Sequence, residues 1–216
     1  MDTSVTFYKM KNELQSIISG ESQVKHGAII QAAARYLKGS QGTGKMAEVR
    51  EHFKKEEREY LDYFISEHDL WITTIDLNNY VSEGSEQKVY LKDGNNVIKL
   101  NDAIFYNSWL DYFNNLLLNN YFFPDTAYQL LGFYKDNHVL YAVVEQSFVK
   151  ATEKTDLNLV KEFMESNGFT NTRNNDYYNS ELGIILEDLH DENVLTKNGL
   201  LQFIDTVFYI TNDFYK

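Results

Sequence analysis

The spacing of hydrophobic residues changes once along the chain, near Leu70, and this change most restricts how the chain can fold. Before it, apolar residues recur at helical spacing in three stretches, which include Ile18, Leu37 and Phe64. After it, short runs of alternating apolar and polar residues are separated by turn sequences such as Asp93-Gly94. A helical region followed by hairpins predicts an α+β fold.

Composition narrows the class of protein further. A hydrophobic content of 43% and an aromatic content of 15% in 216 residues predict a folded globule whose rings lie in the core or in interfaces. A net charge of -12 without a basic stripe argues against nucleic acids and acidic membranes as partners. The absence of cysteine excludes disulfides, thiolate zinc sites and cysteine nucleophiles. No signal peptide or membrane span is recognisable, so we expect a cytoplasmic protein.

The elements expected after residue 70 alternate between strands and helices. In chain order they are a strand at 70–75, a hairpin of 87–91 and 96–100, a helix at about 102–118, a hairpin of 128–134 and 139–145, a helix at 157–166, a strand at 183–186 and a hairpin at 194–204. Asn101 is the expected N-cap of the first of these helices, Phe105 lies on its apolar face, and Pro124 ends that region. We divide the chain into a helical region 1–75 and two further regions, 76–146 and 147–216.

The polar segment 187–193, before the last predicted hairpin, has the residue spacing of a phosphotransfer site. Such a site needs a carboxylate that accepts the proton of the attacking hydroxyl, oxygen ligands for magnesium and a cation for the phosphates. In kinases the base and one metal ligand share the pattern D-x-x-x-x-N, and a second Asp follows the next hairpin. Asp188 and Asn193 have this offset, and Asp205 follows the apolar run 200–204. The pattern predicts Asp188 as base and Asn193 and Asp205 as metal ligands.

The hairpin between these residues makes the hypothesis testable. A three-residue loop at 197–199 would place Asn193 opposite Phe203, so that Asn193 and Asp205 become diagonal neighbours on one face. A two-residue loop, Asn198-Gly199, would turn the two side chains to opposite faces. The metal hypothesis therefore predicts the three-residue loop, unless the ladder ends before Asn193.

The sequence D-L-H-x-x-N-V-L from Asp188, followed by an apolar strand and Ile204-Asp205, resembles the catalytic and metal loops of the protein-kinase-like superfamily. It looks closer to the aminoglycoside phosphotransferase branch, because His190 follows the Asp. From about Tyr80 onward the chain also resembles the kinase-like domain of polyvalent proteins from bacterial mobile elements. The resemblance implies a small lobe of antiparallel sheet plus one helix, a reduced C-terminal lobe, use of ATP and Mg²⁺, and a supporting role for His190.

The resemblance also assigns residues to the nucleotide. They are Gly84 and Ser85 in the glycine-loop region, Lys99 as the phosphate-binding lysine, Asp111 as its acidic partner on the following helix, and Glu145 and Gln146 in the hinge that meets the adenine. Two features depart from the kinase pattern. The loop has one glycine where kinases usually have three, and only eleven residues follow Asp205, too few for the usual activation segment.

Several interpretations remain open from sequence. The chain could be an ATP- and Mg²⁺-dependent phosphotransferase acting on a hydroxyl of an unknown protein or small molecule. It could equally be a catalytically inactive module that binds nucleotide or another protein. An aromatic-rich interaction protein fits the composition but leaves the polar loop unexplained. Asp188 and His190 also suit turn and cap positions, where Asp is favoured for local hydrogen bonding.

A second phosphate-binding pattern is misleading. The segment 39–45 matches G-x-x-x-x-G-K, but it follows an Ala-rich helix and is followed by Met46 instead of Ser or Thr. We therefore expect a helix–helix linker there. The remaining histidines have no partners at ligand spacing, and we expect them to be surface or packed residues; they are His26, His52, His68 and His138.

Overall fold

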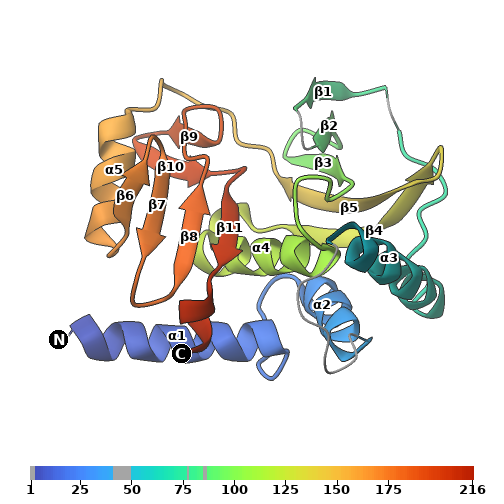
Figure 1. Cartoon of the computed structure of the whole chain (residues 1–216). Helices are drawn as coiled ribbons and strands as arrows, with labels where there is room; N and C mark the ends of the chain where they lie inside the picture. The colour runs from blue at the N-terminus through green and yellow to red at the C-terminus, as the bar shows by residue number, and fades with distance from the viewer. Residues whose placement is uncertain (1–2, 41–49, 77, 85–86) are drawn as a thin grey trace.

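The computed structural model describes residues 3–40, 50–76, 78–84 and 87–216. Three helices lead into a five-stranded antiparallel sheet with one helix inserted, and a second, four-stranded sheet follows beside it (Figure 1). The α+β fold predicted from the change in hydrophobic spacing is confirmed.

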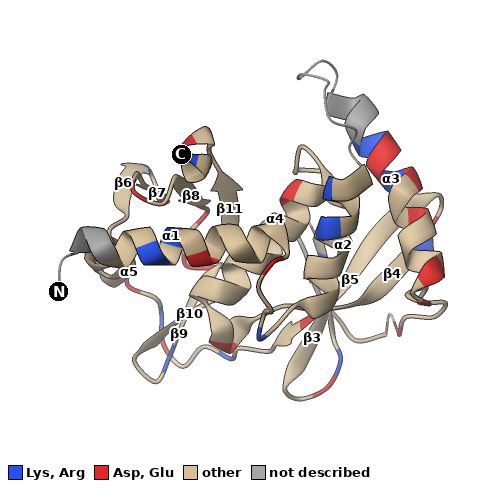
Figure 2. Cartoon of the chain, turned by 90° about the horizontal axis from the view of Figure 1, so that it is seen from below, with Lys and Arg blue, Asp and Glu red and all other residues tan. Residues whose placement is uncertain are grey.

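The N-terminal helices are α1 (Thr3–Ser19), α2 (Ala28–Ser40) and α3 (Arg50–Glu67). Their apolar positions at helical spacing are buried, among them Leu14, Ile30, Leu37 and Leu61. Viewed from below, α3 shows basic and acidic residues interspersed along its length, as expected for a solvated face (Figure 2). None of the described helices combines the length and the apolar character that crossing a membrane requires.

The first sheet has the order β1-β2-β3-β5-β4, and every neighbouring pair is antiparallel. Its strands are β1 (Tyr80–Glu83), β2 (Gln87–Leu91), β3 (Asn96–Asn101), β4 (Gln129–Asp136) and β5 (Val139–Ser147). The two hairpins predicted for this part of the chain, 87–100 and 128–145, are present. The predicted strand at 70–75 is wrong, because β1 occupies the place beside β2. The run 70–75 instead covers the outer face of the sheet: Trp71 forms an isolated bridge to Phe133, and Ile72 and Ile75 pack on a cluster that includes Leu100.

The inserted helix α4 (Trp109–Phe122) begins later than predicted. The N-cap is Ser108, whose hydroxyl accepts a hydrogen bond from the Asp111 amide at 2.9 Å, so the prediction of Asn101 is wrong. Asn101 ends β3, and its side-chain oxygen accepts a bond from the Ala103 amide. Ala103 has φ of 57°, a left-handed conformation that stops a helix from starting there. Phe105 consequently lies outside the helix and is 53% exposed.

The second sheet has the order β11-β8-β7-β6. The elements of this region are α5 (Leu157–Ser166), β6 (Thr170–Arg173), β7 (Asp176–Asn179), β8 (Ile184–Glu187), β9 (Val194–Lys197), β10 (Leu200–Phe203), β11 (Val207–Ile210) and the short 3-10 helix η2 (Asn212–Tyr215). The predicted helix α5 is confirmed. Sequence reasoning did not anticipate the four-residue strands β6, β7 and β11.

Helix α4 connects the two sheets. It runs below the first sheet and beside β11 of the second in Figure 1, and Phe113 and Leu117 on it are buried in one core that also includes Leu14 of α1 and Ile184 of β8. Pro124 begins a 3-10 helix, η1 (Pro124–Thr126), directly after it. Phe123, between α4 and η1, stacks on Phe203 of β10 with ring centroids 4.0 Å apart and planes 6° apart. The shared helix and this aromatic contact hold the sheets on either side of a cleft.

Candidate active site

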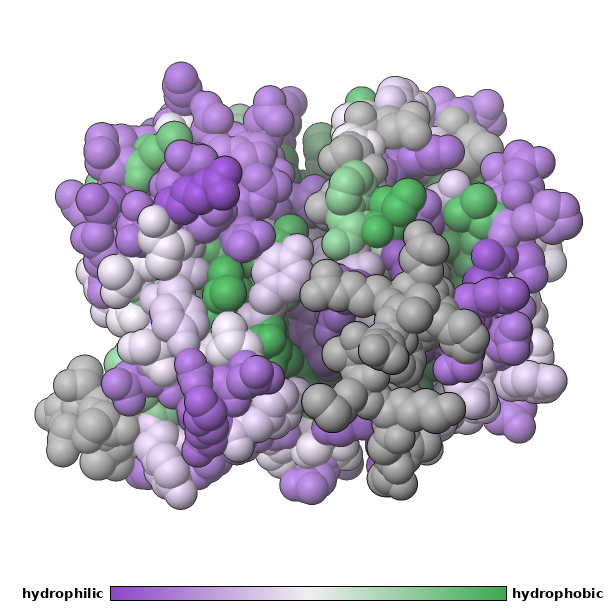
Figure 3. All heavy atoms as spheres, in the orientation of Figure 1, coloured by the Kyte–Doolittle hydropathy of each residue, from purple (hydrophilic) through white to green (hydrophobic). Residues whose placement is uncertain are grey.

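A cleft of about 510 Å³ lies between the first sheet and the loops of the second region. The space-filling view shows the molecule hollowed between these two halves (Figure 3). The lining residues come from β1, β2 and β3, from the end of β5 and from the loops that flank β9 and β10. They include Gly84, Gln87, Val89, Val97, Lys99, Gln146, Asp188, His190, Asn193, Leu195, Ile204 and Asp205.

Asp188 lies in the loop that follows β8, in an unusual backbone conformation. Its φ is 69°, a left-handed value that costs a non-glycine residue on the order of 1 kcal/mol. The Asp188 amide donates to Asp176 Oδ1 at 3.2 Å, and His190 Nε2 lies 3.2 Å from Asp188 Oδ1. The Glu192 amide donates to His190 Nδ1 at 3.2 Å, and Asn193 Nδ2 lies 3.2 Å from His190 Nε2, so both ring nitrogens have partners within the loop. His190 thus orients Asp188.

Asn193 contacts the same carboxylate from the other side. Its Nδ2 donates to Asp188 Oδ2 at 2.9 Å and to the Asp188 carbonyl at 3.0 Å. Both bonds use the amide nitrogen, and the amide oxygen is the atom that ligates hard cations. The offset of five residues therefore forms a closed loop in which Asn193 and His190 each hold one carboxylate oxygen of Asp188.

The hairpin register differs from the prediction. Lys197 faces Leu200 and Val194 faces Phe203, so the connection is the two-residue loop Asn198-Gly199. Both loop residues have positive φ, 52° and 75°, which defines the type I′ turn that Asn-Gly favours. The predicted three-residue loop is wrong.

The metal hypothesis allowed one exception, a ladder that ends before Asn193, and the structure shows this arrangement. The side-chain ladder ends at the pair Val194 and Phe203, before Asn193. Beyond it, the Ile204 amide donates to the Asn193 carbonyl at 2.9 Å, and the chain then turns at Asp205 towards β11. Strict alternation of faces no longer governs these residues, and Asn193 and Asp205 line the same cleft.

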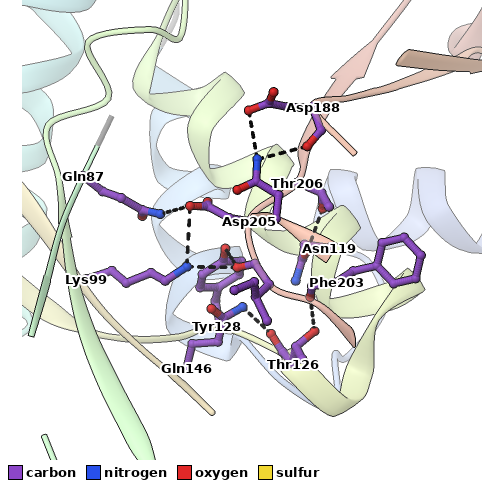
Figure 4. Close-up of polar contacts among 12 residues, drawn as sticks. Gln87, Lys99, Asn119, Thr126, Tyr128, Gln146, Asp188, Phe203, Asp205 and Thr206 are labelled. Atoms are coloured by element: carbon purple, nitrogen blue, oxygen red, sulfur yellow. Dashed lines mark hydrogen bonds and ion pairs between the residues drawn. The ribbon is translucent and has the colours of Figure 1, made fainter. Parts of the chain in front are cut away.

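Lys99 lies on β3 with its side chain only 4% exposed. Its Nζ donates to the Ile204 carbonyl at 2.9 Å and lies 3.9 Å from Asp205 Oδ2 (Figure 4). Burial lowers the pKa of Lys99, and the Asp205 carboxylate partly opposes this shift. The carboxylate paired with Lys99 is therefore Asp205, whereas the resemblance had implied Asp111. Asp111 lies in the first turn of α4, near enough to Tyr215 to add to the effect of burial in raising the pKa of that phenol.

Gln87 is a cleft residue that sequence reasoning missed. Its Nε2 donates to Asp205 Oδ2 from β2, across the cleft from the metal loop (Figure 4). The available signal was the period of two along strands: Gln87 and Val89 share one face of β2, as Val97 and Lys99 share one face of β3. Val89 pairs with Lys99 across these strands, so apolar side chains flank the ammonium.

Of the other residues predicted to contact the nucleotide, some line the cleft and others do not. Gly84 lines the cleft, and Ser85 lies outside the described residues. Gln146 is buried, lines the cleft and donates from Nε2 to the Thr126 carbonyl at 2.7 Å. Glu145 does not line the cleft; its carboxylate pairs with Lys92 at 2.7 Å.

The misleading phosphate-loop pattern lies mostly outside the described residues. Of its residues, Gly39 and Ser40 form the last turn of α2, and 41–45 are not described. Among the other histidines, His68 follows α3 and donates from Nδ1 to the Phe64 carbonyl at 2.9 Å, and neither it, His26 nor His138 lines the cleft. Within the described ranges, no three His, Asp or Glu side chains gather as a group that could hold a metal ion.

A family model described as serine/threonine/tyrosine kinase found in polyvalent proteins matches residues 54–212. The chain belongs to this kinase family. The match confirms the resemblance seen in the sequence and covers Lys99, Asp188, Asn193 and Asp205, whereas α1 and α2 precede it. Searches of curated proteins and of solved structures returned no match.

The cleft residues fit the magnesium nucleotide that kinases of this family imply. Apolar side chains flank the space from the first sheet and from β9, as an adenine ring requires; they are Val89, Val97 and Leu195. Lys99 offers a buried cation for phosphate oxygens, and Asp205 and Asn193 offer oxygen ligands. One carboxylate and one amide are few ligands for a cation, which suits magnesium that also binds phosphates and water.

Proposed function

We propose that this protein transfers the γ-phosphate of ATP to a hydroxyl group of an acceptor in the presence of Mg²⁺. The observation that carries the proposal is that residues from three separate segments, at kinase spacing, line one cleft: Lys99, the pair Asp188 and Asn193, and Asp205. Membership of a kinase family supports the reaction class.

Lys99 would bind the phosphates. Its ammonium is held at a fixed position by the Ile204 carbonyl, and Asp205 at 3.9 Å favours the charged form that phosphate binding needs. Asn193 and Asp205 would hold Mg²⁺, which neutralises charge on the phosphate oxygens when it is bound.

Asp188 would act as the general base. One of its carboxylate oxygens faces His190 and the other accepts from Asn193, so the carboxylate has a defined orientation at the cleft. As the acceptor oxygen bonds to phosphorus and the bond to the leaving oxygen breaks, the hydroxyl proton passes to Asp188. His190 and Asn193 position this carboxylate.

One observation favours the alternative of a nucleotide-binding module without activity. Asp205 Oδ2 accepts from Gln87 and lies near Lys99, so a metal ion must replace at least the contact with Gln87. A chain in which this contact persists would bind nucleotide weakly or without metal.

A thermal-shift titration with ATP, with and without Mg²⁺, tests the proposal. Ligand at 100 times its Kd adds about 2.7 kcal/mol of stability, and we expect magnesium to enlarge the shift. Asp205→Ala should remove the magnesium-dependent part. Asp188→Asn, which tolerates the left-handed backbone, should keep the shift but abolish autophosphorylation and acceptor-dependent ADP formation.

The outcomes separate the two functions. A wild-type protein that shows no shift with ATP and Mg²⁺ contradicts both. A shift without any phosphate transfer by the wild type, against a broad set of hydroxyl acceptors, supports the binding module.

A further inference from the structure

The segment 203–208, which carries Asp205, is held by side chains of β3, of α4 and of the stretch 126–128 that leads into β4. Thr126 Oγ1 donates to the Phe203 carbonyl, and the Tyr128 hydroxyl donates to the Ile204 carbonyl at 2.8 Å. Lys99 donates to that same carbonyl. The metal loop is therefore attached to the opposite side of the cleft before any ligand binds.

Helix α4 adds two contacts to this segment. Asn119 Oδ1 accepts a hydrogen bond from Thr206 Oγ1 at 3.1 Å, and Asn115 Oδ1 accepts one from the Phe208 amide at 2.8 Å (Figure 4 shows the first). The two asparagines are four residues apart and so lie on one face of the helix. Both are buried, at 0% and 3% exposure, and Thr206 follows Asp205 directly.

We propose that Asn119 and Asn115 are positioning residues, which fix the metal-binding carboxylate of Asp205 from helix α4. This inference rests on the proposed phosphotransfer function. The helix has no acidic side chain paired with Lys99, whose carboxylate partner is Asp205. Helix α4 therefore acts on the site through amide groups bonded to the residues that flank the metal ligand.

The side-chain amide of Asn119 is only partly satisfied by hydrogen bonds. Its Oδ1 is bonded to Thr206, but its Nδ2 has no hydrogen-bond partner among the described residues. A buried amide with an unsatisfied donor lowers stability, and a leucine of similar size would remove that cost.

The decisive variant is Asn119→Leu, with Asn114→Leu as its matched control. Asn114 is also a buried asparagine of α4 with an unsatisfied Oδ1, but it makes no hydrogen bond to the segment 203–208 among the described residues. We expect Asn119→Leu to keep or raise the Tm without ligand. The Mg²⁺ concentration that half-saturates the ATP-dependent thermal shift should rise about tenfold, the effect of losing one well-formed hydrogen bond. Asn114→Leu should leave that concentration unchanged.

Thr206→Val removes the other partner and keeps the test decisive if Asn119→Leu does not fold. It should raise the half-saturating Mg²⁺ concentration by a similar factor, and the double variant should show no further increase, because both changes remove one interaction. A purely structural role would lower the Tm and leave the magnesium dependence as in the wild type.

Two failures are distinguishable. If the wild type shows no magnesium-dependent shift with ATP, the proposed function fails and this inference fails with it. If the wild type responds, but Asn119→Leu and Thr206→Val both retain its magnesium dependence, only the positioning role is overturned.

Discussion

Lys99 is a cleft residue whose buried charge lowers the stability of the fold. Its side chain is 4% exposed, and the Asp205 carboxylate with which it pairs is 3.9 Å from Nζ and partly in solvent. The free energy lost on burying a charged group exceeds the stabilisation that a distant, partly solvated carboxylate provides. The lowered pKa of Lys99 reflects this cost, with burial as the larger cause and Asp205 opposing it.

Replacing Lys99 with methionine is expected to stabilise the ligand-free protein at pH 7 by on the order of 1 kcal/mol while abolishing ATP binding. The gain should depend on pH. At pH values below its lowered pKa, Lys99 is protonated in both the folded and the unfolded protein, and the full destabilisation from burying its charge is present. Between that pKa and the ordinary value of 10.5, the unfolded state binds more protons, so the wild type gains stability as pH rises. The advantage of Lys99→Met should therefore shrink towards pH 10.5.

Urea unfolding at pH 7 and pH 10 measures this difference. Lys92→Met is the control, because Lys92 also pairs with a carboxylate, that of Glu145, but is exposed on the surface. A Lys99→Met protein that is less stable than the wild type at pH 7, or whose advantage does not change with pH, would contradict the prediction.

At the scale of elements, helix α3 supports the start of α4. Glu57 of α3 is 2% exposed, and its Oε2 accepts a hydrogen bond from the Trp109 amide at 2.7 Å. Ser108 satisfies the Asp111 amide of the same first turn. A carboxylate at the N-terminus of a helix also interacts favourably with the helix dipole. The N-terminal region is thus connected to the helix that contacts the metal loop.

We expect Glu57→Ala to lower the free energy of unfolding by about 1–2 kcal/mol, because an amide of the first turn of α4 loses its acceptor in a buried position. Glu59→Ala, an exposed position on the same helix, should change it by less than about 0.5 kcal/mol. Chemical denaturation measures both. Equal effects of the two substitutions would show that the contact with Trp109 contributes nothing.

At the scale of the whole molecule, a single core joins the regions that sequence reasoning divided at 75 and 146. Leu14, Ile30, Phe113 and Ile184 belong to one buried cluster, with members in the helical region, in α4 and in the second sheet. Domains that unfold separately need separate cores. The shared cluster favours unfolding as one cooperative unit.

Calorimetry should therefore show one transition with equal calorimetric and van't Hoff enthalpies. Leu186→Ala, in β8 of the second sheet, should lower the stability by about 2–5 kcal/mol. It should shift tryptophan fluorescence and circular dichroism equally, although Trp71 and Trp109 both lie beside the first sheet. Two separate transitions, or a fluorescence midpoint unaffected by Leu186→Ala, would show independent domains.

Local patterns in the sequence were sufficient for the parts of the protein that depend on near neighbours. The helical spacing before Leu70 and the turn sequence Asp93-Gly94 predicted elements that form, because periodicity and turn geometry act over a few residues. The offset between Asp188 and Asn193 predicted a loop whose members bond to one another, since five residues can close on themselves.

Contacts between distant segments were decided only by the tertiary structure. The carboxylate partner of Lys99 and the hydrogen bond from Gln87 to Asp205 each join residues whose pairing depends on how the two halves pack. The same holds for Asn119 and Thr206, which are 87 residues apart in sequence. Their proximity follows from the packing of α4 beside β11, and no pattern over a few residues encodes that arrangement.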